Sequence, residues 1–403
     1  MATEAAKDEL AGAQQHSPES HELLGEERPE GAQSTSRETR VTCSRGFSSW
    51  LINQNCSLVF SSYQTGRLFF VGVTPERKLS FYQRQFTRAM GIAASSERIF
   101  LASLIQVWRL ENVLRPRQQT KNGFDRVFVP RNCQVTGDLD VHEIGVLASG
   151  EPIFVNTLYS CLATFSRTHS FKPVWQPQFI SRLAAEDRCH LNGLAMENGA
   201  PRYVTAVCRS DIVTGWRDRR AEGGCIIDVT TNQVLTEQLS MPHSPRVQSG
   251  QLWVLDSGRG YVARIDRSTG KREDVTFCPG FLRGLAFTGK YAVVGLSLPR
   301  DGAFAGLELD SELKKRDAEP RCGLNIIDLD SGDIVHWLRL DGRIKETFDV
   351  AVLPGARCPM ALGLASAEIR THITVEGKDV PAPGADRPMP QNIADNEMSS
   401  SHP

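Results

Sequence analysis

Three of the nine histidines occupy the same position of a recurring sequence pattern. They are His142, His190 and His243, and each begins a short segment that runs into apolar residues. Three neutral imidazoles that converge on one point suit Fe, Zn, Cu or Mn and leave coordination positions open for water or substrate. The pattern therefore predicts a divalent metal site. The alternative is that the three side chains line a water-filled channel separately.

The pattern occurs six times, at spacings typical of a repeated structural unit. The segments are RAMGIA from Arg88, HEIGVL from His142, HLNGLA from His190, HSPRVQ from His243, FLRGLA from Phe281 and TFDVAV from Thr347. Glycine holds the fourth position in four of them, namely Gly91, Gly145, Gly193 and Gly284. A second apolar run follows each segment, the last of these runs being PMALGLA. Each segment is thus expected to form the first strand of a sheet and each run the second.

The rest of the folded part also reads as short strands joined by turns. Runs such as QLWVLDS, YAVVGLS and LNIIDLD are rich in β-branched and aromatic residues and are bounded by Gly, Pro, Asp or Asn. Six such units predict an all-β chain folded as a six-bladed β-propeller. The N-terminal runs SLVFSSY, RLFFVGV and KLSFYQRQF are expected to complete the last blade. If they form a blade of their own, the ring has seven blades.

Composition sets the boundaries of the propeller domain at residues 41–374. Residues 1–40 and 375–403 are polar and poor in bulky apolar residues, so they are expected to be disordered tails. Two long polar inserts, 209–224 and 298–321, leave from the ends of second strands. We expect them to cover the mouth of the channel, with Trp216 placed to cover a ligand.

Further candidate site residues follow from the same alignment. The first strands should line the channel, which makes Glu143, Arg283 and Asp349 the candidate catalytic residues. Candidate substrate-binding residues lie in the first strands or at the ends of the second strands: Asn156, Asn192, Arg209, Asp256, Arg259 and Arg300. The planar fork of arginine suits a carboxylate or a phosphate. The alternative for each arginine is a salt bridge at the surface or between blades.

Charge and composition argue against several classes of protein. A formal net charge of -1 gives no electrostatic case for a nucleic acid or an anionic membrane as partner. No apolar run is long enough to span a bilayer, and the N-terminal segment has no secretory signal. The ten cysteines include no C-x-x-C pair, and several lie in apolar runs, so a cytoplasmic location is expected. Phosphate-binding, dinucleotide-binding, H-E-x-x-H and G-x-S-x-G motifs are absent.

Several segments together resemble a bacterial family of uncharacterised propeller-like proteins. They are DVHEIG, CHLNGLA, MPHSPR, LWVLDSGRG, FLRGLA and CGLNIIDLDSGDIVHWLRLDG, and the resemblance covers about residues 45–372. It implies a fold and no activity. More distantly, three histidines around a six-bladed channel are similar to the zinc site of peptidyl-hydroxyglycine amidating lyases. The gluconolactonase and senescence-marker propellers hold a divalent metal with acidic and Asn ligands, which only Asn192 and Asp349 match here.

These observations predict a metal-dependent enzyme that acts on a small anionic or peptide substrate. A lyase or an oxygenase is favoured over a hydrolase or an isomerase. Two alternatives remain open: a non-catalytic propeller that binds a ligand or a protein, and a receptor that uses the arginines alone. No nucleic-acid or membrane partner is expected, and the sequence leaves the oligomeric state unknown.

Overall fold

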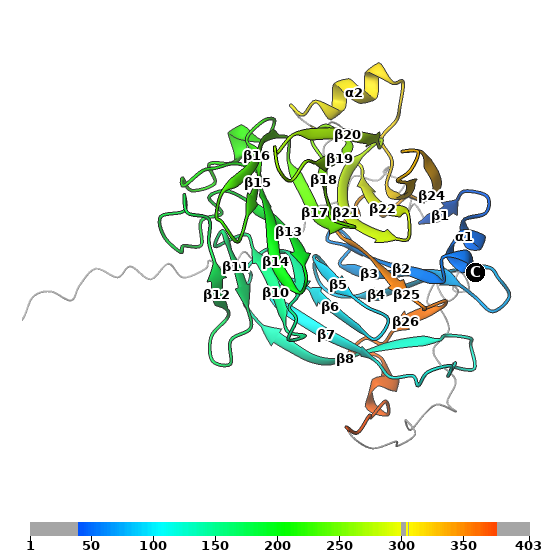
Figure 1. Ribbon diagram of the computed structural model, residues 1–403. Coiled ribbons are helices and arrows are strands. Elements are labelled where there is room, and N and C mark those ends of the chain that lie inside the picture. The colour runs from blue at the N-terminus through cyan, green and yellow to red at the C-terminus, as the bar shows by residue number, and fades with distance from the viewer. Residues whose placement is uncertain (1–38, 300–303, 305, 377–403) are drawn as a thin grey trace, which may run out of the picture. The chain divides into compact units, whose positions relative to one another are not determined.

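The computed structural model describes residues 39–299, 304 and 306–376. Within this part of the chain, six sheets of four or five strands are arranged as blades around a common axis (Figure 1). The short helices α1 (Phe47–Asn53) and α2 (Leu309–Lys315) and the 3₁₀ turn η1 (Arg217–Arg219) connect strands, and a second 3₁₀ turn, η2 (Ala367–Arg370), follows the last strand. The prediction of an all-β, six-bladed propeller is confirmed, and the seven-bladed alternative is wrong.

The blades are numbered 1 to 6 around the ring, and their strands are given from the innermost outwards. Blade 1 consists of β25 (Val350–Pro354), β2 (Cys56–Ser62), β3 (Arg67–Val73) and β4 (Leu79–Gln85). Blade 2 consists of β5 (Ile92–Ala94), β6 (Arg98–Ala102), β7 (Gln106–Asn112), β8 (Arg126–Val135) and β26 (Pro359–Ala361). Blade 3 consists of β9 (Val141–Val146), β10 (Pro152–Asn156), β11 (Cys161–Thr164) and β12 (Lys172–Trp175).

The remaining three blades follow in chain order. Blade 4 consists of β13 (Leu191–Glu197), β14 (Ala200–Ala206), β15 (Gly224–Asp228) and β16 (Val234–Leu239). Blade 5 consists of β17 (Pro242–Gln248), β18 (Gln251–Asp256), β19 (Tyr261–Ile265) and β20 (Arg272–Phe277). Blade 6 consists of β21 (Phe281–Thr288), β22 (Tyr291–Ser297), β23 (Gly323–Asp328), β24 (Ile334–Asp341) and β1 (Arg40–Cys43).

Blade 1 joins the two ends of the ring. Its inner strand β25 pairs antiparallel with β2, as in the pair Leu58 and Val352, and Figure 1 shows the orange β25 beside the blue β2. This confirms that the N-terminal runs complete the last blade. Each inner strand contacts the inner strands of both neighbouring blades, so the ring is closed. The apolar core lies between blades, as where Phe100 of β6 packs with Phe154 of β10.

The run PMALGLA does not form the second strand of the last blade, so that expectation is wrong. The place beside β25 is taken by β2, and residues 359–361 instead form β26, which pairs in parallel with β8. This pairing covers the outer edge of blade 2, and β1 covers the edge of blade 6 in the same way. The edge strands of these two blades are therefore short, and short edge strands are less prone to pair with a second chain.

The repeated glycines allow neighbouring inner strands to approach closely. A Cβ atom added to Gly91 would lie 2.8 Å from the Glu143 Cα atom in β9 of the next blade. Gly193 faces Pro245 of the next blade in the same way, and Gly284 faces Val350 with a φ of +76°. Glycine is required there because any side chain would push two inner strands apart.

Hydroxyl groups join successive blades near the starts of the inner strands. In four blades, a Ser or Thr at the end of the second strand donates to a backbone carbonyl of the next blade, over 2.5 to 3.1 Å. The pairs are Ser61 with Met90, Thr157 with Leu191, Ser257 with Leu282, and Ser297 with Thr347. These bonds hold in place the chain segments that carry the candidate site.

The predicted tails lie outside the described residues, apart from residues 39, 40, 375 and 376. No helix in the part of the chain that the structure describes has the length and apolar composition needed to cross a membrane.

Candidate functional site

A cavity of about 670 Å³ lies where the inner strands begin. Three of the predicted residues line it: His142, His190 and Arg283. Both long inserts contribute to its wall, with Trp216, Arg217 and Arg220 from the first and Leu298, Pro299, Phe304 and Leu307 from the second. The inserts thus lie where the sequence placed them, and a cavity of this size accommodates a small organic molecule.

His142 is buried, and its ring orientation is set by two acceptors. The Nδ1 atom lies 3.0 Å from the Asp140 carbonyl oxygen and 2.9 Å from the Thr157 hydroxyl oxygen. The Thr157 hydroxyl donates to the Leu191 carbonyl, so it accepts from His142. Burial lowers the pKa of His142 to about 4, because the charged imidazolium loses its hydration.

His243 repeats this arrangement two blades further on. Its Nδ1 atom lies 2.8 Å from the Met241 carbonyl oxygen and 3.2 Å from the Ser257 hydroxyl oxygen. Burial, and secondly the charge of Arg283, lower the pKa of His243 well below its ordinary value. The Nε2 atom is buried and has no hydrogen-bond partner among the described residues. A buried polar atom without a partner is costly, which makes this atom a candidate ligand-binding group.

His190 is oriented by a carboxylate. Its Nδ1 atom lies 2.9 Å from an oxygen of Asp187, which also accepts from Trp216 Nε1 over 2.8 Å. The Trp216 ring stacks on His190 with a centroid distance of 4.2 Å and an interplanar angle of 29°. The first insert is therefore attached directly to a predicted site residue.

The three histidines share one tautomer. A carbonyl oxygen can only accept, so Nδ1 of His142 and of His243 must carry the proton, and the Asp187 carboxylate favours the same tautomer in His190. Each Nε2 atom then carries a lone pair. The acceptors are held by strained backbone, since Asp140, Asp187 and Met241 have φ values of 54°, 41° and 47°.

The structure brings two of the three histidines into ring contact. The centroids of His142 and His190 are 4.9 Å apart at an angle of 81°, whereas His243 lies against Phe281 at 5.5 Å. Within residues 39–299, 304 and 306–376, no group of three or more His, Cys, Asp or Glu side chains is placed to hold a metal ion. The donor types nevertheless fit a divalent metal, because each Nδ1 has an acceptor and the buried Nε2 of His243 has no partner.

Glu143 and Asp349 belong to a separate ion-pair cluster with Arg246. The Arg246 guanidinium from β17 contacts Glu143 in β9 and lies 3.7 Å from Asp349, just before β25. Asp349 also accepts from the backbone N–H of Ile92 over 2.7 Å. Burial raises the pKa of Glu143 to about 8 and that of Asp349 to about 6. Neither carboxylate is among the residues that line the cavity.

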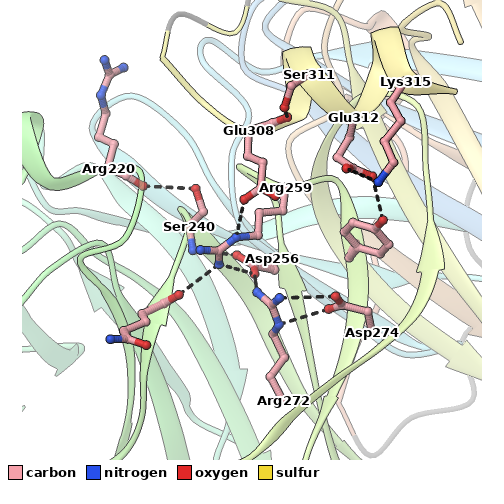
Figure 2. Close-up of polar contacts among 12 residues, drawn as sticks. Arg220, Ser240, Asp256, Arg259, Arg272, Asp274, Glu308, Ser311, Glu312 and Lys315 are labelled. Atoms are coloured by element: carbon pink, nitrogen blue, oxygen red, sulfur yellow. Dashed lines mark hydrogen bonds and ion pairs between the residues drawn. The ribbon is translucent and has the colours of Figure 1, made fainter. Parts of the chain in front are cut away.

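Asp256 and Arg259 form an ion pair within blade 5 and are not among the cavity-lining residues. Asp256 is fully buried, accepts from Arg259 over 2.9 Å and also contacts Arg272 (Figure 2). Arg259 donates in addition to Glu308, directly before α2, over 2.9 Å (Figure 2). The cluster therefore connects blade 5 to the second insert.

Helix α2 is held by further contacts on the same side. The Tyr261 hydroxyl donates to Glu312 over 2.9 Å, and Leu309 and Leu313 pack with Phe304. Phe304 is one of the cavity-lining residues, so blade 5 and α2 together fix one wall of the cavity. Of the predicted substrate-binding residues, Asp256 and Arg259 therefore have an indirect role in the described structure.

The other predicted substrate-binding residues lie apart from the cavity-lining set. Asn156 accepts from the Tyr159 backbone N–H over 3.1 Å, and Asn192 accepts from the Thr205 hydroxyl over 2.7 Å. The Nδ2 atoms of both asparagines are buried without a partner among the described residues. Arg209 is exposed and pairs with Glu237 over 2.7 Å, as expected of a surface salt bridge. Arg300 lies outside the described residues.

A family match covers most of the propeller. Residues 45–362 match the family described as "Domain of unknown function (DUF4915)". The chain belongs to this family. The description of the DUF4915 domain names no activity, so any argument about chemistry depends on the residues of the site. No curated protein matches the chain.

Two solved structures are similar to the DUF4915 domain at low identity. One is described as "Crystal structure of Nidogen/Laminin Complex", with 9% identity, a TM-score of 0.47, and coverage of 75% of this chain and 99% of that chain. The other is described as "Streptogramin B lyase structure", with 10% identity, a TM-score of 0.36, and coverage of 71% of this chain and 76% of that chain. At these scores, neither carries an argument about function.

Several site residues of the DUF4915 domain were missed from the sequence. Asp187, Thr157 and Ser257 orient the histidines, and Phe348 contacts His142 at a centroid distance of 5.3 Å. One signal was available, because an acidic residue precedes His142 by two residues and His190 by three. The hydroxyl groups follow the second strands and become visible as partners only when the strands are paired.

Proposed function

We propose that this chain is a metal-dependent enzyme whose cavity takes a small anionic or peptide substrate. The proposed ligands of a divalent Fe, Zn, Cu or Mn ion are the Nε2 atoms of His142, His190 and His243. One observation carries the proposal: all three Nδ1 atoms face acceptors, which leaves three Nε2 lone pairs. The chemistry that such an ion supplies is polarisation of a substrate oxygen or activation of a water molecule.

The other residues of the cavity have separate roles in this proposal. Arg283 binds the anionic group of the substrate, because its guanidinium lies in the cavity wall beside Phe348. Trp216 covers His190 and excludes water from that side. Glu143 and Asp349 act as positioning residues through Arg246. A lyase or an oxygenase reaction is the proposed class.

A second candidate function is binding of a small anion without catalysis. It is favoured by the finding that no three potential ligands in the described residues are placed to hold a metal. In that case, the histidines accept hydrogen bonds from the ligand through Nε2, and Arg283 supplies the charge.

Elemental analysis of the purified protein separates the two candidates. We expect one equivalent of Fe, Zn, Cu or Mn in the unaltered protein and its loss in each of His142→Ala, His190→Ala and His243→Ala. His169→Ala is the matched control, because His169 is exposed and outside the cavity. Unaltered protein that contains no metal and cannot be loaded with any of the four would exclude the metalloenzyme and leave the binding function.

We further propose a cytoplasmic location and no nucleic-acid partner. All ten cysteines are free thiols, which is typical of a reducing compartment. A fluorescent fusion of the full chain that is found outside the cytoplasm would contradict this proposal.

A further inference from the structure

The charge of the cavity wall favours an anion. Four basic side chains line the cavity, namely Arg217, Arg220, Arg283 and Lys345, against the two acids Asp140 and Glu346. Both acids already have partners: Asp140 pairs with Arg88 over 2.6 Å, and Glu346 accepts from the Gln64 backbone N–H over 2.7 Å. A wall of this composition attracts negative charge.

Two aromatic rings lie against Arg283, which is the one of these four basic side chains that stands on an inner strand. The Arg283 Cζ atom of β21 lies 4.5 Å from the ring centroid of Phe348 and 5.9 Å from that of Phe281. Phe348 stacks with Tyr63 at 6.2 Å and 29°, and Phe281 stacks with Phe304 at 6.3 Å and 20°. All four rings line the cavity. Arg283 thus lies between two stacked aromatic pairs, and its contact with Phe348 restricts its orientation.

This arrangement selects the shape of the ligand as well as its charge. A guanidinium that lies over a ring binds a carboxylate through its edge, with two parallel hydrogen bonds in one plane. The carbon skeleton of the carboxylate then extends alongside the neighbouring rings. Planar rings gain more than aliphatic ones from such contacts, because aromatic pairs are favourable beyond their buried area.

We propose that the ligand is a carboxylate attached to a planar aromatic or heteroaromatic ring, bound by Arg283 between the Tyr63–Phe348 and Phe281–Phe304 pairs. This deepens the proposed function and rests on its small anionic substrate, but it does not require the metal. The contact of Phe348 with His142 places such a ligand beside the histidines.

Calorimetric titration of chelator-treated protein tests the class of ligand directly. The probes are benzoate, cyclohexanecarboxylate with the same charge and no planar ring, benzamide with the ring and no charge, and inorganic phosphate. We expect benzoate to bind at least about tenfold more tightly than each of the other three, a difference that one good contact supplies. Equal affinities for benzoate and cyclohexanecarboxylate, or tighter binding of phosphate, would overturn the inference.

Two variants locate the site. Arg283→Lys keeps the charge and loses the planar fork, so benzoate should bind about tenfold more weakly. Phe348→Leu keeps an apolar side chain and loses the ring, so the preference for benzoate over cyclohexanecarboxylate should fall. Arg264→Lys is the control, because Arg264 pairs with Glu273 on the exposed side of blade 5. Thermal unfolding confirms that each variant is folded. Unchanged benzoate affinity in folded Arg283→Lys would contradict the assignment.

The outcome is distinguishable from that of the metal experiment. Selective benzoate binding, together with purified protein that contains no metal and cannot be loaded with one, would exclude the metalloenzyme and keep this inference. One equivalent of metal in the purified protein, with no preference for benzoate, would support the metalloenzyme and exclude this inference.

Discussion

Two clusters built from the same repeated segment differ in how far their polar atoms are paired within the protein. The histidine cluster, His142, His190 and His243, uses the first position of the segment. The ion-pair cluster, Glu143, Arg246 and Asp349, uses the three positions that follow. In the histidine cluster, each Nδ1 atom has an acceptor and the buried Nε2 of His243 has no partner. In the ion-pair cluster, two buried carboxylates share one guanidinium and several backbone N–H donors.

Neighbouring positions of one segment thus have different roles: the ion-pair cluster joins blades, and the histidine cluster is available to bind a ligand. Ion pairs across the ring join β9, β17 and the start of β25, so they hold blades 3, 5 and 1 together. His142 and His190 line a cavity, and the buried Nε2 atom of His243 has no hydrogen-bond partner among the described residues. Burial disfavours the charged form of both groups, so it lowers the pKa of His142 and raises the pKa of Glu143. Protonation therefore destabilises the folded protein at the histidine and stabilises it at the carboxylate.

The largest effect is expected from Arg246→Met. The substitution removes the cation shared by the buried Glu143 and Asp349 carboxylates, which should lower the free energy of unfolding by about 3 to 5 kcal/mol. The control Arg264→Met removes an exposed ion pair and should cost less than about 1 kcal/mol. Chemical denaturation at neutral pH measures both. If the two variants were equally stable, the ion-pair cluster would not be the element that joins the blades.

An intermediate effect is expected in the dependence of stability on pH. His142 has a folded pKa of about 4, below its ordinary 6.5, so its contribution is present above pH 6.5 and is lost as the pH falls. Glu143 has a folded pKa of about 8, above its ordinary 4.5, so its contribution is present below pH 4.5 and is lost as the pH rises towards 8. A tenfold change in a proton-binding constant on folding corresponds to about 1.4 kcal/mol of stability.

Two glutamine variants should therefore reduce losses in the free energy of unfolding that occur in opposite directions of pH change. His142→Gln should reduce the loss of stability as the pH falls from about 6.5 to 4, and Glu143→Gln should reduce the loss as the pH rises from about 4.5 to 8. Denaturation curves from pH 4 to pH 9 test this, with His169→Gln as a variant that should follow the unaltered protein. If both variants reduced the loss of stability in the same direction of pH change, the two clusters would not respond to protonation with opposite sign.

The smallest effect is expected from Thr157→Val. Loss of the hydroxyl leaves the Leu191 carbonyl without this donor, at a cost of about 1 kcal/mol. Thr276→Val should cost a similar amount, because Thr276 donates to the Gly332 carbonyl over 2.8 Å far from the histidines. Only Thr157→Val should change the ring-nitrogen chemical shifts of His142 in NMR spectra. Identical His142 spectra in both variants would mean that Thr157 does not orient the ring.

Much of the fold was predictable because its signals are local. Alternating short strands and six repeated segments, four of them marked by glycine, indicated the blades, and polar composition placed the two inserts beside the cavity. The course of residues 359–361 was not predictable. Their apolar run suits any sheet edge, and the choice of β8 depends on β2 already occupying the place beside β25.

For the site, the sequence by itself determined that His142, His190 and His243 begin three successive inner strands, because residue type and repeat register are written along the chain. It also placed Arg283 on an inner strand beside them. Only the tertiary structure decided the distant partners: Trp216 on His190, Arg246 on Glu143, and Phe348 on Arg283. These contacts join residues from different blades and inserts, and their distances depend on how the closed ring brings those segments together.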